Sequence, residues 1–287
     1  MSSCLSVCQS KYGRQVWQKF KNQSRKHEMR KARNQIIFFV FSNFRAFVIK
    51  IVLIPGLSGL GSRRMNSMDQ KYLSPTSIID SDHPTVIEYA KETVKDAGSD
   101  PVAQAVKLYY AVRDNIWYDP YYPFYLPEHY RASNIIKSSR GFCISKAGLL
   151  CALGRACGIP SRVGFATVKN HLATPKLLEF IGSDLFIYHG YTEFYLTGKW
   201  IKATPTFNIE LCEKHHVTPL DFNGREDAIF HEFNQEKKQF MEYLEYHGIY
   251  ADIPIDNILD EWKKAYGEDR IKKWMDNFEI TGTTNPD

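Results

Sequence analysis

Two segments of this chain constrain its fold more than any other feature. The first, GFCISKAGLLCALGRACGIPSRVGF over residues 141–165, places a cysteine at the start of a helix of small and apolar residues. The second, HGYTEFYLTGKWIKATPT over residues 189–206, places a histidine at the head of a β-hairpin. A cysteine thiol and a strand-borne imidazole are the minimum for thiol-dependent acyl chemistry. The two segments therefore predict both a mixed fold and a candidate site.

The first segment has the spacing of an amphipathic helix over residues 143–157. Small and apolar residues recur on one helical face: Cys143, Ala147, Leu150, Cys151 and Gly154. Gly158 and Pro160 then end the helix. A thiol at a helix N-terminus faces unpaired N–H groups and the positive end of the helix dipole, which favour the thiolate. A buried structural cysteine is the alternative interpretation.

The second segment predicts a hairpin that turns at Thr197-Gly198. This turn sets Glu193 opposite Lys202, which gives a cross-strand pair of opposite charge. In the same register His189 lies diagonal to Thr204 on one face of the hairpin, within side-chain reach.

The remaining patterns predict an α+β architecture in which helices precede antiparallel strands. Helices are expected over residues 83–95 and 101–116, and the Tyr- and Pro-rich segment 117–133 is expected to form a shaped wall of the site. A charged helix is expected near 234–246, followed by a short terminal helix that begins near residue 255.

Charge divides the 287-residue chain into two parts. Residues 1–68 hold thirteen Lys and Arg but a single acid, whereas residues 69–287 are mildly acidic. We therefore expect a basic, partly apolar extension over 1–68, outside a globular domain over 69–287. The stretch 11–33 could contact an anionic membrane or nucleic acid. The apolar run 36–57 is interrupted by Arg45 and Lys50, so a membrane span ranks last among its interpretations.

The cysteine pattern favours a reducing, cytoplasmic location, because six sparse cysteines do not resemble a disulfide framework. Peripheral membrane association through residues 1–68 is the alternative. Cys212, His215 and His216 are close in sequence, but no fourth ligand is spaced for zinc, so solvated loop residues are the preferred interpretation and no metal is expected.

Together the two segments resemble the transglutaminase-like superfamily of papain-type thiol enzymes. The family pattern is Gly-x-Cys opening a helix that ends in Gly-Ile-Pro-x-Arg, followed by a strand-borne His with Glu four residues later, and then Asp-Pro-Thr. Here the matching residues are Cys143, His189 and Glu193, and the similarity extends over roughly residues 100–210. The resemblance implies a papain-like α+β core with Cys143 as nucleophile and His189 as general base.

One position departs from that family pattern. The aspartate falls on Thr204, which gives Thr-Pro-Thr. Such an aspartate orients the imidazole and stabilises the imidazolium. A threonine hydroxyl can accept a hydrogen bond from the ring but adds no charge. Thr204 is the first candidate to orient His189, and Asn208 is the second, as an asparagine does in papain-type enzymes. A third interpretation is an impaired site.

The resemblance implies a thiol enzyme that acts on amide or peptide bonds of a protein or peptide substrate, without a cofactor. Hydrolysis is favoured over cross-linking because it needs only water as the acyl acceptor. The alternative is a catalytically impaired family member that serves as a protein-binding module, and the missing aspartate supports it.

Overall fold

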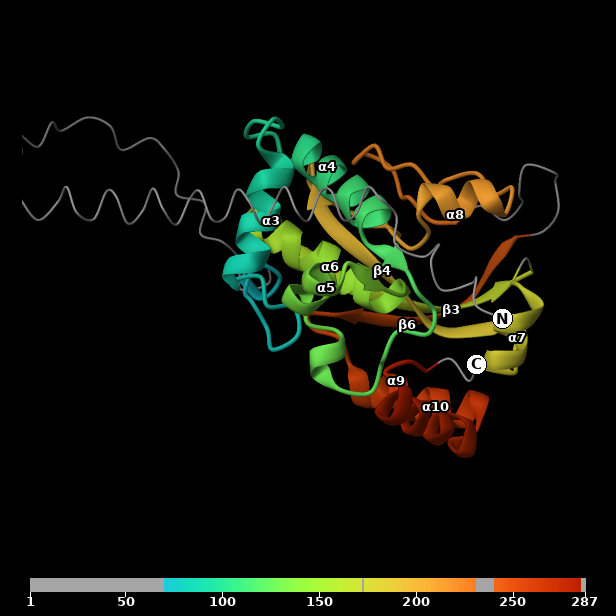
Figure 1. Ribbon diagram of the computed structural model, residues 1–287. Helices are drawn as coiled ribbons and strands as arrows, with labels where there is room; N and C mark the ends of the chain where they lie inside the picture. The colour runs from blue at the N-terminus through green and yellow to red at the C-terminus, as the bar shows by residue number, and fades with distance from the viewer. Residues whose placement is uncertain (1–69, 172, 231–239, 285–287) are drawn as a thin grey trace, which may run out of the picture. The chain divides into compact units, whose positions relative to one another are not determined.

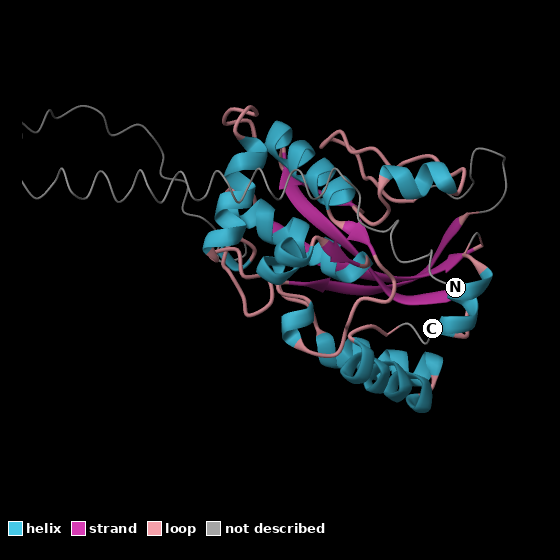
Figure 2. Ribbon diagram, viewed as in Figure 1, coloured by secondary structure: helices cyan, strands magenta, loops and turns pink. Residues whose placement is uncertain are grey.

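The computed structural model describes residues 70–171, 173–230 and 240–284, which form helices packed on a four-stranded antiparallel sheet. The helices lie on either side of the strands (Figure 1), and Figure 2 shows the same arrangement coloured by secondary structure. The predicted α+β class, with the cysteine-bearing helix packed on an antiparallel sheet, is confirmed.

The elements follow one another in the order that Figure 1 colours from blue to red. The helices are α3 (Pro84–Val94), α4 (Pro101–Asn115), α5 (Ala132–Ser138), α6 (Cys143–Ala156), α7 (Pro175–Ile181), α8 (Ile209–Lys214), α9 (Ile255–Tyr266) and α10 (Glu268–Thr281). The sheet has the order β5-β4-β3-β6 and contains β3 (Ser161–Asn170), β4 (Leu185–Leu196), β5 (Lys199–Ala203) and β6 (Met241–Tyr250). A separate parallel pair joins β1 (Trp117–Tyr118) to β2 (Arg140–Gly141).

Helix α6 is the central element of the core. Every residue from Ile144 to Arg155 is buried, because the helix packs on β4 and β3 and is flanked by α3, α4 and α5. Gly154 permits the contact with β4, since a Cβ there would lie 2.5 Å from the ring of Phe194. A helix that is apolar and small on all sides is suited to such a position. The helix predicted over 143–157 is thus confirmed.

The hairpin of β4 and β5 has the predicted turn and register. Thr197 and Gly198 have φ angles of 50° and 88°, the left-handed conformations that a type I′ turn requires. Glu193 lies opposite Lys202 as expected. The carboxylate of Glu193 forms its ion pair with Arg162 of β3 instead, at 2.6 Å. The turn at Thr197-Gly198 fixes this register, and the register determines the face of the sheet on which His189 lies.

Helices α3 and α4 begin and end where the sequence predicts. His83 Nδ1 accepts a hydrogen bond from Thr85 N, and the carboxylate of Asp100 accepts from the first backbone N–H groups of α4. Each of these side chains satisfies a helix N-terminus, and each helix has proline in its first turn. The terminal helix expected near residue 255 is α9.

Two local predictions are wrong. Residues 241–246 of the helix expected near 234–246 lie in strand β6 (Met241–Tyr250), because this segment completes the sheet by pairing with β3. Residues 234–239 of that predicted helix lie outside the described residues. Cys212 lies in helix α8 rather than in a loop, and it is buried. Both segments take their structure from partners distant in sequence.

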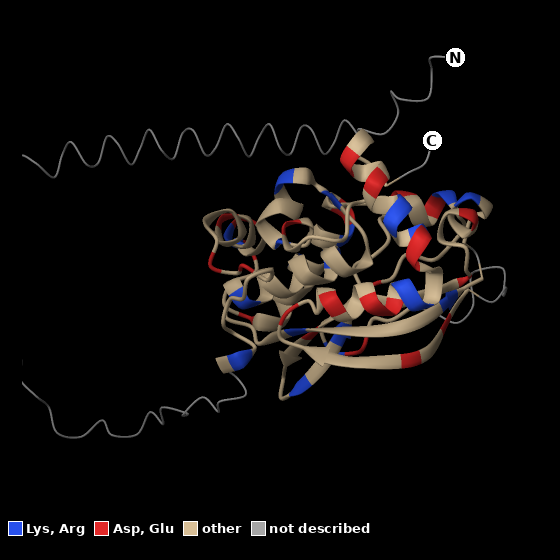
Figure 3. Ribbon diagram, turned by 90° about the horizontal axis from the view of Figure 1, so that it is seen from below, with Lys and Arg blue, Asp and Glu red and all other residues tan. Residues whose placement is uncertain are grey.

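The predicted extension over residues 1–68 lies outside the described residues, so the division of the chain at residue 68 stays a prediction. Charged residues of both signs are interspersed over the described elements (Figure 3). Across residues 70–284, as far as the structure describes them, no helix has the length and apolarity needed to cross a bilayer.

Candidate active site

Cys143 is the first residue of α6, and its neighbours fix the start of that helix. Ser145 Oγ accepts a hydrogen bond from Phe142 N at 2.9 Å and donates to Phe142 O at 3.1 Å. Gly141 leaves room for this hydroxyl, because a Cβ at that position would lie 2.5 Å from it. The thiol is therefore held at the mouth of the helix by its first turn.

Burial and backbone hydrogen bonds act on the Cys143 thiol in opposite directions. Burial raises the pKa of Cys143 to about 11, while hydrogen bonds from the backbone N–H groups of Gly190, Ile144 and Cys143 itself lower it. The N–H groups at the helix start act in the direction that the sequence predicts, but burial outweighs them. Burial therefore opposes the thiolate that the start of the helix favours.

Gly190 brings strand β4 against the start of α6. A Cβ on Gly190 would lie 2.9 Å from Ile144 Cα and 3.3 Å from Cys143 O, both of them backbone atoms. Only glycine allows this approach without moving one chain away from the other. Because His189 directly precedes Gly190, this contact places His189 beside the start of α6. Cys143 and His189 line one cavity.

His189 is 4% exposed, and its ring lies 5.6 Å from the ring of Phe230. Burial lowers the pKa of His189 to about 4, because an imidazolium would lose its hydration there. At neutral pH the site therefore holds a thiol and a neutral imidazole. Such an imidazole can accept the thiol proton when the sulfur attacks a carbonyl group.

A strained backbone immediately precedes the imidazole. Tyr188 has a φ angle of 60°, which is unusual for a bulky side chain. The pairing of β3 with β4 shifts register between Ala166 and Val168, so β4 has a bulge at this point. β-Bulges re-aim side chains and are enriched beside active sites. The bulge sets the direction in which His189 leaves the strand.

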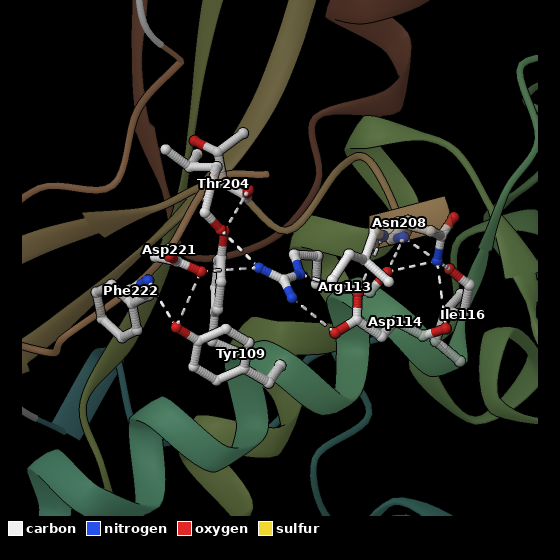
Figure 4. A network of polar contacts seen from close by, with 12 residues as sticks. Tyr109, Arg113, Asp114, Ile116, Thr204, Asn208, Asp221 and Phe222 are labelled. Carbon is white, nitrogen blue, oxygen red and sulfur yellow. Dashed lines mark hydrogen bonds and ion pairs between the residues drawn. The ribbon is translucent and has the colours of Figure 1, made fainter. Parts of the chain in front are cut away.

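Three buried polar atoms on the face of the hairpin that carries His189 have no hydrogen-bond partner among the described residues. His189 Nε2 is buried and has no hydrogen-bond partner among the described residues, and the same is true of Thr204 Oγ1 and Thr206 Oγ1. The carbonyl group of Thr204 lies 3.2 Å from the hydroxyl of Tyr109, which donates to Leu220 O at 2.7 Å (Figure 4).

Asn208 is engaged elsewhere (Figure 4). Its Oδ1 accepts a hydrogen bond from Tyr118 N at 2.7 Å, and its Nδ2 donates to the carbonyl groups of Arg113 and Ile116 at the end of α4. Both ends of the amide group are thus used to join α4 to β1. Among the described residues, neither Asn208 nor Thr204 forms a hydrogen bond with His189 Nε2, so the orienting role stays a prediction.

The cavity beside the thiol has an aromatic wall, part of which comes from the loop that the sequence assigns to this role. The loop and the start of α6 supply Tyr118, Pro120, Tyr122, Phe124, Phe142 and Cys143. The other elements supply Phe180, Ile181, Phe186, Ile187, His189, Trp262, Tyr266, Trp274 and Thr284. None of these residues carries a formal charge at neutral pH, because His189 is neutral.

A family model described as the transglutaminase-like superfamily matches residues 87–205, a segment that contains the Cys-bearing helix and the hairpin. Residues 87–205 belong to the transglutaminase-like superfamily. No curated protein sequence matches the chain at a significant level. The superfamily segment includes Cys143, His189 and Thr204, whereas α9 and α10 lie outside it.

Two solved structures are similar to the chain at low identity. A candidate cysteine protease from Cytophaga hutchinsonii is 18% identical with a TM-score of 0.39, and the match covers 65% of this chain and 55% of that one. A candidate protease from Parabacteroides distasonis is 16% identical with a TM-score of 0.31, over 48% of this chain and 25% of that one. The chain thus spans about half of the first and a quarter of the second.

Other residues with metal-binding or nucleophilic side chains do not form a second site in the described part of the chain. No group of three or more His, Cys, Asp or Glu side chains there could hold a metal ion, and Cys212 lies buried in α8 while His215 and His216 are exposed. Burial raises the pKa of Cys151 and of Cys157 to about 11, so these cysteines are also thiols.

Three residues that shape the site were not identified from the sequence. Gly190 joins β4 to α6, and a glycine inside a strand pattern was its available signal. Ser145 closes the first turn of α6. Lys146 is fully buried and donates from Nζ to the carbonyl groups of Arg113 and Ile116. A lysine in an otherwise small and apolar helix was the only signal for Lys146.

Proposed function

We propose that the chain is a thiol enzyme that hydrolyses an amide or peptide bond through an acyl-enzyme on Cys143. The observation that carries this proposal is the contact of Gly190 with the start of α6, which brings His189 and Cys143 to one cavity. Membership of the superfamily supports the same assignment. The substrate class is a protein or peptide, and no cofactor takes part.

The first step transfers the proton of the Cys143 thiol to the neutral imidazole of His189 as the sulfur attacks the carbonyl carbon. Negative charge then develops on the carbonyl oxygen. The backbone N–H of Cys143, at the start of α6, is placed to donate to this oxygen. The imidazolium returns its proton to the leaving amine, and the thioester of Cys143 remains.

Water completes the reaction. His189 accepts a proton from the attacking water molecule, the thioester carbon–sulfur bond breaks, and the proton returns to the sulfur. An amine in place of water would give transfer or cross-linking. Hydrolysis ranks first because water is always present, and cross-linking would need a bound amine acceptor.

Thr204 is proposed to orient His189, because its hydroxyl is buried on the histidine face of the hairpin. Burial raises the pKa of Tyr243, and its hydroxyl is near enough to Thr204 for that residue to lower the pKa by a smaller amount, so Tyr243 competes for the Thr204 hydroxyl. A hydroxyl can accept a hydrogen bond from the imidazole ring but does not stabilise the imidazolium by charge. The expected rate is therefore lower than that of a site with aspartate in this position.

The proposal is tested by trapping the acyl-enzyme. Purified protein is mixed with peptide thioesters and peptide amides, and intact-mass spectrometry follows acylation of the thiol. Cys143→Ala should abolish both acylation and amide hydrolysis. The matched variant Cys212→Ala, which removes a different buried thiol, should leave both reactions unchanged. Equal hydrolysis by the native chain and Cys143→Ala would overturn the proposal.

A protein-binding module without activity is the second candidate function, and Thr204 in place of the family aspartate favours it. This candidate predicts that Cys143 forms no acyl-enzyme with any ester, thioester or amide. It also predicts that peptide binding is unchanged in Cys143→Ala.

The location is a separate proposal: a cytoplasmic protein, in which residues 11–33 contact a membrane or nucleic acid. Sedimentation with acidic liposomes, with and without residues 1–64, tests the membrane contact.

A further inference from the structure

We propose that this cleft selects a substrate with a bulky, uncharged apolar side chain beside the scissile bond. We also propose that α9 and α10 determine this selectivity. The inference rests on the proposed function, because it concerns the acyl group delivered to Cys143. Both helices lie outside the segment that matches the superfamily. The selectivity would therefore be a property of this chain rather than of the shared core.

Helices α9 and α10 supply three large rings to the wall of the cleft, namely Trp262, Tyr266 and Trp274. Figure 1 shows the two helices side by side at the lower edge of the molecule. The ring of Trp274 stacks on Phe180 of α7 with centroids 4.5 Å apart and an interplanar angle of 20°. The ring of Trp262 lies 6.2 Å from that of Phe142, which directly precedes Cys143.

The loop over residues 117–133 packs against this aromatic wall. The ring of Phe124 lies 5.2 Å from that of Trp262 and 5.9 Å from that of Trp274, so one loop residue contacts both helices. Aromatic pairs at such distances are more favourable than their buried area alone indicates. The wall is thus a packed surface that exists before a substrate binds.

The polar atoms of the two α9 rings are already engaged. Trp262 Nε1 donates to Ile187 O at 2.8 Å. The hydroxyl of Tyr266 donates to Leu185 O at 3.0 Å and accepts from Ile187 N at 2.8 Å. These bonds join α9 to β4 at residues two and four positions before His189. The ring surfaces that remain for a substrate are apolar.

Thr284 is the one residue of the cleft wall with an aliphatic hydroxyl group, and this hydroxyl also forms a hydrogen bond within the protein. Its Oγ1 donates to Tyr121 O at 2.7 Å. A charged substrate side chain would therefore lose its hydration and gain no ion pair from the wall. That loss is costly, whereas each buried CH₂ group of an apolar side chain contributes favourably to binding. Phenylalanine or leucine fits this wall, and glutamate or lysine does not.

The test measures acylation of Cys143 by four matched thioesters, of N-acetyl-phenylalanine, N-acetyl-leucine, N-acetyl-glutamate and N-acetyl-lysine. Thioesters are activated, so they acylate a competent thiol even where amide hydrolysis is slow. We expect phenylalanine and leucine to react at least about tenfold faster than glutamate and lysine, the scale on which pockets discriminate side chains. Equal rates for all four thioesters would overturn the inference.

A pair of variants tests whether the wall sets the preference. Phe180→Glu places a carboxylate against Trp274 and should raise the lysine-to-phenylalanine ratio by about tenfold. Ile280→Glu, on α10 at a residue that is 81% exposed and outside the cleft, is the matched control and should leave the ratio unchanged. An unchanged ratio in a folded Phe180→Glu protein, checked by circular dichroism, contradicts the assignment of the wall. The wild-type profile remains a test if this variant does not fold.

A binding measurement separates the inference from the proposed function. In Cys143→Ala protein, tryptophan fluorescence should report binding of N-acetyl-phenylalaninamide but not of the glutamate or lysine amides. Selective binding without any acylation of the native thiol would support the apolar selectivity of the cleft and contradict the proposed thiol enzyme. Acylation without selectivity would support the proposed thiol enzyme and contradict the apolar selectivity of the cleft. Neither selective binding nor acylation would discard both.

Discussion

The ring of Tyr188 stacks on the ring of His247, with centroids 4.4 Å apart and an interplanar angle of 3°. The contact spans the sheet from β4 to β6, across β3. His247 is also held by Thr167 of β3, whose Oγ1 lies 2.7 Å from His247 Nε2. Because Tyr188 adopts a strained φ directly before His189, this stack supports the backbone from which the candidate base projects.

Replacing His247 should therefore affect catalysis although His247 does not line the cleft. His247→Ala removes the stacked ring, and we expect kcat to fall by about 10- to 100-fold with little change in KM, since small displacements of a catalytic group have effects of this size. His247→Phe keeps the ring and should restore most of the activity. His215→Ala, which changes an exposed histidine directly after α8, is the control. Equal kcat in His247→Ala and the native chain would show that the stack does not position His189.

The position of Thr204 gives a second prediction. Thr204→Asp places a carboxylate where the superfamily has one, and it should raise the pKa of His189 from about 4 by stabilising the imidazolium. We expect kcat/KM to rise by about tenfold or more, in proportion to what such an aspartate contributes in related sites. Steady-state kinetics and an NMR titration of His189 measure the two effects.

Two companion variants make this result specific. Thr204→Asn introduces a similar shape without charge and should leave the pKa of His189 low. Thr204→Val removes the hydroxyl and should lower kcat if that hydroxyl orients the ring. A Val variant with native kcat would show that Thr204 has no orienting role. An Asp variant that folds and leaves the pKa of His189 unchanged would show that position 204 does not contact the imidazole.

The buried imidazole predicts how stability depends on pH. Burial lowers the pKa of His189 from 6.5 to about 4, so between these values the unfolded chain binds the proton that the folded chain excludes. The free energy of unfolding should therefore fall as the pH falls from 6.5 to 4, by up to about 3 kcal/mol from this residue. Urea denaturation of the native chain and of His189→Gln at each pH measures this contribution, because the variant should lose less stability than the native chain between pH 6.5 and 4.

The pKa of His189 also predicts how the rate of acylation falls at low pH. His189 must be neutral to accept the thiol proton, so acylation of Cys143 should decline only as the pH approaches about 4. Thr204→Asp should move this limb to higher pH, because it raises the pKa of the imidazole. A native limb near pH 6.5 would show that His189 is hydrated in solution and that the cleft opens to water.

The sequence was sufficient where the determinants are local. Cys143 begins α6 because the helix ends are encoded within residues 141–160, and the turn at Thr197-Gly198 fixes the register that carries His189. Strand β6 was missed because its structure comes from pairing with β3, more than 70 residues earlier. The engagement of Asn208 was missed because its partners lie at the end of α4. The protonation of the thiol depends on burial, which no local pattern reports.

Gly190 gives the sharpest test of how the site is assembled. Gly190→Ala sets a Cβ 2.9 Å from Ile144 Cα, a backbone atom that cannot turn aside. We expect β4 and α6 to separate, which should cost about 1–3 kcal/mol of stability and displace His189 from Cys143. Acylation of Cys143 should then fall by about 100-fold, as expected for a catalytic group displaced by roughly 1 Å.

Gly148→Ala is the matched control, because it adds a methyl group to α6, the helix that Gly190 of β4 contacts. That Cβ would lie 2.8 Å from Ile253 Cδ1, the tip of a flexible side chain that can rotate away. Alanine also favours the helix over glycine by about 1 kcal/mol. The control should therefore keep its stability and its acylation rate. If both variants lose acylation equally, general packing of α6 rather than the contact at Gly190 brings thiol and imidazole together.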